Sequence, residues 1–77
     1  MNPTKLSKQE AAEIVARLTP RQKYILLLLA RGRSFKQIVR RHGMSYSTIR
    51  AHARAACQRM GVYSTMQAVV IMARALP

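Results

Sequence analysis

Apolar residues recur at intervals of three and four along most of this chain, and no stretch alternates apolar and polar residues long enough to predict a strand. The pattern predicts five helices, at about residues 8–17, 20–31, 35–42, 46–60 and 65–75. We therefore expect an all-α fold: a small helical bundle of four core helices plus an extra amino-terminal helix.

The predicted helices have recognisable start and stop signals. A Ser or Thr followed three residues later by Glu or Gln forms a capping box, and four such patterns open apolar-periodic segments: Ser7–Glu10, Thr19–Gln22, Ser34–Gln37 and Ser64–Gln67. Pro20 suits a first helical position. A glycine follows three of the helices, where a left-handed carboxyl cap is expected: Gly32, Gly43 and Gly61.

Residues 34–60 predict a helix-turn-helix, in which Gly43 permits the turn, Met44 fills the corner and Ser45 caps the second helix. The core positions of that second helix are Ile49, Ala53, Ala56 and Met60. The opposite face carries Ser47, Ala51, Arg54 and Gln58, with Arg50 on its flank. Small side chains beside two arginines suit a DNA major groove. The alternative is an ordinary solvated face, but such faces normally mix both charges.

Charge is the unusual feature of the composition. The 77 residues contain 14 Lys+Arg and 2 Asp+Glu, for a formal net charge of +12. Both acids, Glu10 and Glu13, precede the core helices, so carboxylate-based catalysis and carboxylate metal sites lack their residues. With one cysteine and two histidines, the chain cannot fill a tetrahedral zinc site alone. We therefore expect a cytoplasmic protein that is not an enzyme, with no cofactor, no metal and a polyanionic partner.

The order and spacing of several motifs resemble the LuxR-type (GerE-type) helix-turn-helix family. They are Leu18-Thr19-Pro20-Arg21, Ala30-Arg31-Gly32, Ser34-x-Lys36-x-Ile38, Gly43-Met44-Ser45, Thr48-Ile49-Arg50-Ala51-His52, Met60-Gly61-Val62 and Gln67-Ala68. The resemblance implies a bacterial or phage transcriptional regulator with its third core helix in the major groove of double-stranded DNA. It implies base contacts by Arg50, Ala51 and Arg54. It also implies phosphate contacts by Ser34, Lys36, Ser45, Ser47 and Thr48. We expect Gln58, on the predicted helix 46–60, to contact phosphate as well.

Three residues depart from the pattern of this family. Gln22 replaces a usual Glu, Phe35 a small polar residue, and Ala56 a large apolar residue. The core near Ala56 is therefore looser, or is filled by helix 8–17. We expect two parts, an arm and helix over residues 1–17 and the family domain over 18–77, without an amino-terminal regulatory domain. The helix at 8–17 has three candidate roles: covering the bundle, covering a dimer, or binding a partner.

The last helix suggests self-association. Val62, Met66, Val69, Val70 and Met72 leave more apolar surface than one small core covers, and the resemblance implies a homodimer through this helix. Two recognition helices about 34 Å apart would then bind a pseudo-palindromic site. Simple core packing is the alternative. The competing function is an interaction protein that sequesters LuxR-type regulators or docks on RNA polymerase. A membrane-active peptide fits poorly, because capping boxes and glycine stops indicate a tertiary fold.

Overall fold

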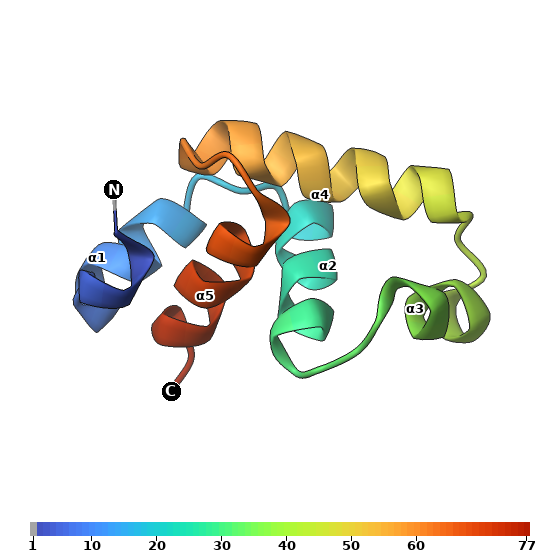
Figure 1. Cartoon of the computed structure of the whole chain (residues 1–77), viewed down its shortest axis with the longest axis horizontal. Coiled ribbons are helices and arrows are strands. Elements are labelled where there is room, and N and C mark those ends of the chain that lie inside the picture. The colour runs from blue at the N-terminus through green and yellow to red at the C-terminus, as the bar shows by residue number, and fades with distance from the viewer. Residues whose placement is uncertain (1) are drawn as a thin grey trace.

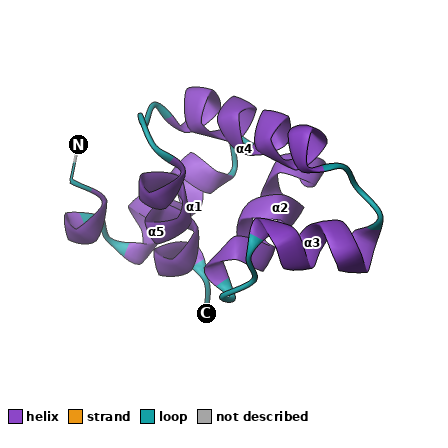
Figure 2. Ribbon diagram, turned by 45° about the vertical axis from the view of Figure 1, so that its right-hand side comes forward, coloured by secondary structure: helices purple, strands orange, loops and turns teal. Residues whose placement is uncertain are grey.

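The computed structural model describes residues 2–77 and contains five α-helices and one short 3-10 helix. The elements are η1 (Pro3–Lys5), α1 (Lys8–Val15), α2 (Pro20–Ala30), α3 (Phe35–His42), α4 (Tyr46–Met60) and α5 (Thr65–Ala75). No strand occurs within these residues. The all-helical prediction is confirmed. Figures 1 and 2 show α4 along one side of the molecule and the other helices beneath it.

Local capping explains where the helices begin. The predicted capping boxes form at α1, α2 and α3, where Ser7, Thr19 and Ser34 each accept from the third helical N–H. The box predicted for α5 is only half right. Ser64 Oγ accepts from the Gln67 N–H at 3.2 Å, but Gln67 Oε1 accepts from the Tyr63 N–H at 2.9 Å rather than from Ser64. The side chain of Gln67 therefore also holds the preceding loop.

Two glycines end the helices of the predicted helix-turn-helix. Gly43 closes α3 with φ 68° and Gly61 closes α4 with φ 74°, both in the left-handed region that a residue with a Cβ rarely adopts. The backbone N–H of Gly43 donates to the carbonyl of Val39 at 3.1 Å. The abrupt end of α3 lets the chain turn and start α4 at Tyr46, after three intervening residues.

The core consists of two clusters joined by α2. Ile25, Ile38 and Ile49 form the smaller cluster, where α2, α3 and α4 meet, and Met44 packs against it as predicted. The larger cluster connects α1, α2, α4 and α5 through eleven buried residues. Ala56 is fully buried in that cluster together with Ala11, Ile14 and Leu18. Helix α1 therefore contributes Ala11 and Ile14 to the same cluster that buries Ala56.

Helix α1 covers α5 of its own chain, which is the first of the three roles considered for it. The two helices lie side by side in Figure 1 and share one buried cluster. Two arginines fix the amino-terminal segment to the bundle through backbone carbonyls. Arg74 Nε donates to the carbonyl of Leu6 at 2.8 Å, and Arg59 Nη1 donates to that of Arg17 at 3.3 Å.

Candidate nucleic-acid interface

The two faces of α4 differ as the periodicity predicts. Ile49, Ala53, Ala56 and Met60 point inward and are at most 2% exposed. The predicted DNA-facing residues Ser47, Arg50, Ala51, Arg54 and Gln58 are all exposed. Packing against the rest of the bundle thus fixes the rotation of α4 and leaves its polar face open to a ligand.

A cluster of hydroxyl groups marks the amino terminus of α4. Ser45 Oγ accepts from the Thr48 N–H at 3.1 Å and donates to Thr48 Oγ1 at 2.7 Å, and Ser47 Oγ lies 3.2 Å from Ser45 Oγ. All three side chains are exposed. Hydroxyls at a helix start, where backbone N–H groups also point outward, are suited to binding a phosphate.

The start of α3 offers a second set of predicted phosphate contacts. Ser34 caps the helix by accepting from the Gln37 N–H at 3.1 Å, while its own N–H donates to Gln37 Oε1 at 2.8 Å. The Ser34 hydroxyl keeps its proton available for another acceptor. Lys36 is exposed in the first turn of α3, where its ammonium group extends into solvent.

Two aromatic side chains, Tyr46 and Phe35, support Arg50 through contacts that the sequence does not predict. The guanidinium carbon of Arg50 lies 5.8 Å from the centre of the Tyr46 ring, and Tyr46 meets Phe35 edge-on with ring centres 5.6 Å apart. Phe35, which departs from the family pattern, thus packs across the turn against α4. The cation–π contact restricts Arg50 to a smaller set of orientations on the open face of the helix.

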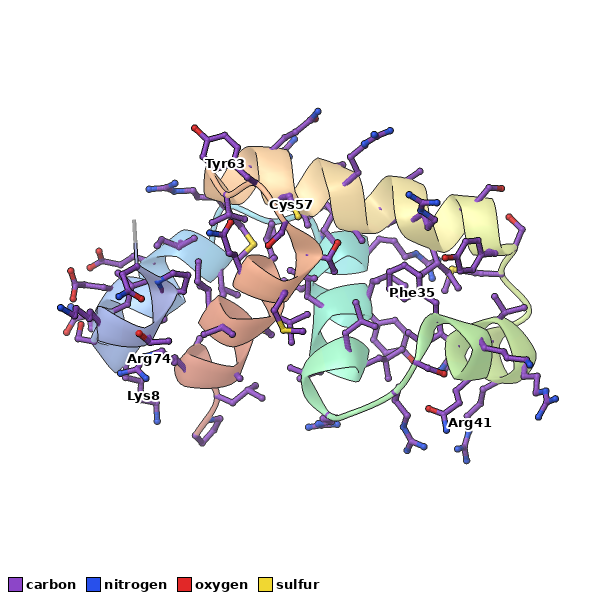
Figure 3. The ribbon with its side chains drawn as sticks, in the orientation of Figure 1. Lys8, Phe35, Arg41, Cys57, Tyr63 and Arg74 are labelled. Atoms are coloured by element: carbon purple, nitrogen blue, oxygen red, sulfur yellow. The ribbon has the colours of Figure 1, made fainter. Side chains whose placement is uncertain are left out.

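The arginines of α4 border an open hollow that reaches the start of α5. This hollow has a volume of about 460 Å³ and is lined by Arg50 and Arg54 from α4 and by Tyr63, Ser64 and Thr65. Tyr63, also missed from the sequence, is 98% exposed and lies beyond the end of α4 in Figure 3. The structure therefore brings a phenol and two hydroxyls beside the predicted base-contacting arginines.

Cys57 also lines this hollow. Burial raises the pKa of its thiol, with a smaller opposing effect from a hydrogen bond with Thr65. Cys57 is 8% exposed and belongs to the larger core cluster, where it packs as a small apolar residue. No group of three metal-ligating side chains occurs in the described part of the chain. Likewise, no helix within residues 2–77 is long and apolar enough to cross a membrane.

The predicted dimer residues have different environments. Val62 and Met72 are 8% and 4% exposed and pack within the single chain, so they offer little surface to a partner. Met66 is 71% exposed, and Val69 and Val70 are half-buried. With the exposed Ala73, these three residues form an apolar stripe at helical spacing along the outer side of α5.

A helix-turn-helix whose second helix exposes arginines among small side chains, in a chain with a large positive charge, defines a DNA-binding domain. The model of the bacterial regulatory proteins, luxR family (GerE), matches residues 16–72. The chain therefore belongs to this family of DNA-binding transcription regulators. Neither a search of curated proteins nor a search of solved structures finds a match.

Proposed function

We propose that the protein is a sequence-specific regulator that binds double-stranded DNA as a homodimer, with α4 in the major groove, in the bacterial cytoplasm at the nucleoid. The open face of α4 is the observation that carries this proposal. Arg50 and Arg54 extend there beside Ala51, and no acidic side chain occurs anywhere in α2 to α5. Small neighbours allow the helix backbone to approach the base edges closely.

This proposal assigns base contacts to one set of residues and phosphate contacts to another. Arg50 and Arg54 read bases, most simply the O6 and N7 acceptors of guanine. Phosphates are bound by hydroxyl, amine and amide groups on either side of the reading face: Ser34, Lys36, Ser45, Ser47, Thr48 and Gln58. Phosphate contacts supply affinity without sequence preference, whereas arginine–guanine pairs discriminate between sequences.

The apolar stripe on α5 supports the homodimer. Met66 and Ala73 are exposed on one side of the helix, and Val69 and Val70 between them are only half-buried, although Val69 also packs against the larger core cluster. Helices α1 and α2 cover the other sides of α5. Pairing of two such stripes around a twofold axis would bury them and present both α4 helices on one face of the duplex. Recognition helices about 34 Å apart would bind an inverted repeat.

Selection from random duplex DNA at about 0.15 M salt tests the function. An inverted repeat enriched by the protein supports specific dimeric recognition. A single enriched half-site supports specific binding without the dimer. Binding without any enriched motif would show that charge alone drives the interaction, and the proposal of sequence-specific regulation would be wrong.

One surface favours the alternative of an interaction protein. An open hollow of about 390 Å³ with mainly apolar surface lies between α1, α2 and α5, bordered by Val15, Tyr24, Leu27, Met72 and Leu76. Exposed apolar surface of this kind often contacts another protein. Recovery of a LuxR-type regulator or RNA polymerase from lysate, with nuclease present, would support sequestration or polymerase docking instead.

A further inference from the structure

A second basic surface lies on α3, on the side that faces away from α4. Arg33, Arg40 and Arg41 surround an open hollow of about 290 Å³, and Gln37 completes its lining. All four residues are exposed. Figure 3 shows Arg41 beneath α3, whereas α4 runs along the top of the molecule. A duplex that lies along the open face of α4 and reaches Ser34 and Lys36 at the start of α3 would leave Arg40 and Arg41, in the last turn of α3, free for another ligand.

The charge of this surface is not compensated by acidic side chains, and helix stability explains only part of it. Both acidic side chains belong to α1, which lies at the opposite end of the molecule from α3 in Figure 1. Arg40 and Arg41 in the last turn interact favourably with the helix dipole. Arg33, however, precedes the amino terminus of α3, where a positive charge opposes that dipole. Its position beside the other two arginines is better explained by a shared anionic ligand.

The chemistry of the lining favours phosphodiester groups over a protein partner. Guanidinium groups bind phosphate oxygens in a planar, two-bond geometry, and three arginines line this hollow. A protein interface instead needs an apolar or aromatic centre, and the lining contains no apolar side chain. Cations without base-reading neighbours are sufficient for binding a nucleic-acid backbone irrespective of sequence.

We propose that Arg33, Arg40 and Arg41 bind the phosphate backbone of a second DNA duplex while α4 occupies the first. This inference rests on the proposed function, since it assumes that the first duplex lies on α4. A single domain then bridges two DNA segments, one read by sequence and the other bound without sequence preference. The second contact should weaken steeply with salt, by about 0.9 in the logarithmic slope for each phosphate neutralised.

A two-duplex retention assay tests the proposal. A duplex carrying the selected site is fixed to beads and saturated with protein, and a fluorescent duplex of unrelated sequence is then added. The test variant is Arg33→Gln/Arg40→Gln/Arg41→Gln. A matched control, Lys5→Gln/Lys8→Gln/Lys23→Gln, removes the same number of charges from exposed sites outside both surfaces. Helical content by circular dichroism establishes that each variant is folded.

We expect the wild type and the control to retain the fluorescent duplex, and the α3 variant to lose about tenfold or more of it. Binding to the fixed duplex should change by less than about threefold in the α3 variant. An equal loss on both duplexes would place Arg33, Arg40 and Arg41 on the first duplex and overturn the proposal. Bridging that survives in the α3 variant would do the same, because it would come from the two α4 helices of a dimer.

Two further outcomes separate this inference from the proposed function. A wild type that binds the fixed duplex but retains no second duplex overturns the inference and leaves the proposed function intact. A wild type that binds no duplex at all refutes both. If the bead-bound protein retains labelled polyglutamate in place of the second duplex, the surface belongs to an acidic protein and the proposal is wrong.

Discussion

Replacing Arg54 by alanine separates reading of the sequence from general attraction to DNA. Arg54 is exposed and forms no hydrogen bond with another residue in the described chain, so its removal breaks no hydrogen bond in the free protein. Alanine is also at least as favourable as arginine within a helix. We therefore expect Arg54→Ala to leave the fold unchanged and to act only on the complex.

The expected magnitude follows from the chemistry of one base contact. A bidentate arginine–guanine pair contributes about 1–3 kcal/mol of discrimination, which corresponds to roughly 5- to 150-fold weaker binding of the preferred duplex. Fluorescence anisotropy with the preferred duplex and with a scrambled duplex measures both affinities. The preferred duplex should lose that factor, and the scrambled duplex should change little.

Lys36→Ala is the matched comparison, because it removes one exposed cation from the proposed phosphate contacts. It should weaken both duplexes similarly and reduce the logarithmic salt slope by about 0.9. If Arg54→Ala also weakened both duplexes equally, Arg54 would contact phosphate rather than a base. The assignment of reading to the open face of α4 would then be refuted at this residue.

Tyr46→Ala should weaken binding of the preferred duplex by about two- to fivefold in the same anisotropy assay, because it removes the ring that supports Arg50 and such contacts contribute about 0.5–1 kcal/mol at exposed sites. Val70→Arg should convert a dimer into monomers in sedimentation velocity without lowering the melting temperature by more than a few degrees, since Val70 is only half-buried on the outer side of α5. No change in mass would rule out the proposed dimer surface. Ile49→Ala should destabilise the domain by about 2–5 kcal/mol in urea unfolding, because Ile49 is fully buried at the α3–α4 contact. The thiol of Cys57, whose pKa is raised by burial, should react slowly with a disulfide reagent at pH 8 and quickly in urea, whereas equal rates would show that it is accessible in the folded protein.

The sequence predicts the helix boundaries well because capping is local chemistry. A serine or threonine hydroxyl and a glycine with positive φ act within a few residues, so four of the five ranges agree to within one residue. The exception is α1, which ends at Val15 rather than near residue 17. Its last backbone bonds shorten to the i to i+3 type, from Arg17 to Ile14 and from Leu18 to Val15, and no glycine marks this end.

The position of α1 was not predictable from its own residues. Its apolar side establishes that it must pack against something, but that pattern fits the bundle, a second subunit or a partner equally. The contacts that fix the segment join residues 42 and 68 positions apart and involve backbone carbonyls, which every residue possesses. Only the three-dimensional arrangement of α4 and α5 selects among the alternatives.

The candidate site likewise has a part that the sequence predicts and a part that it does not. Helical periodicity predicts which residues of α4 are exposed, because one side of the helix must be buried. The edge-on contact between Phe35 and Tyr46 crosses the turn and depends on the angle between α3 and α4, which the pattern does not define. The spacing of Tyr46 and Arg50 by four residues on one helix was the available signal for the cation–π contact.

The chemistry of the caps itself supports the location proposed for the nucleic acid. The same box is built with Glu10 in α1 but with Gln22 in α2 and Gln37 in α3. Hydrogen bonds from the backbone N–H and then the hydroxyl of Ser7 lower the pKa of Glu10, so this residue is a charged carboxylate at neutral pH. A carboxylate at a helix start gains from the dipole, whereas glutamine gives up that gain and keeps the hydrogen bond. Helices α2 and α3 therefore lack this stabilisation, and among the three only α1, which lies far from the helix-turn-helix, has it. At α3, Gln37 keeps a carboxylate away from Ser34 and Lys36, the proposed phosphate contacts, where it would repel a bound polyanion. At α2 this explanation does not apply, because the family usually has Glu at the position of Gln22, and Gln22 is buried.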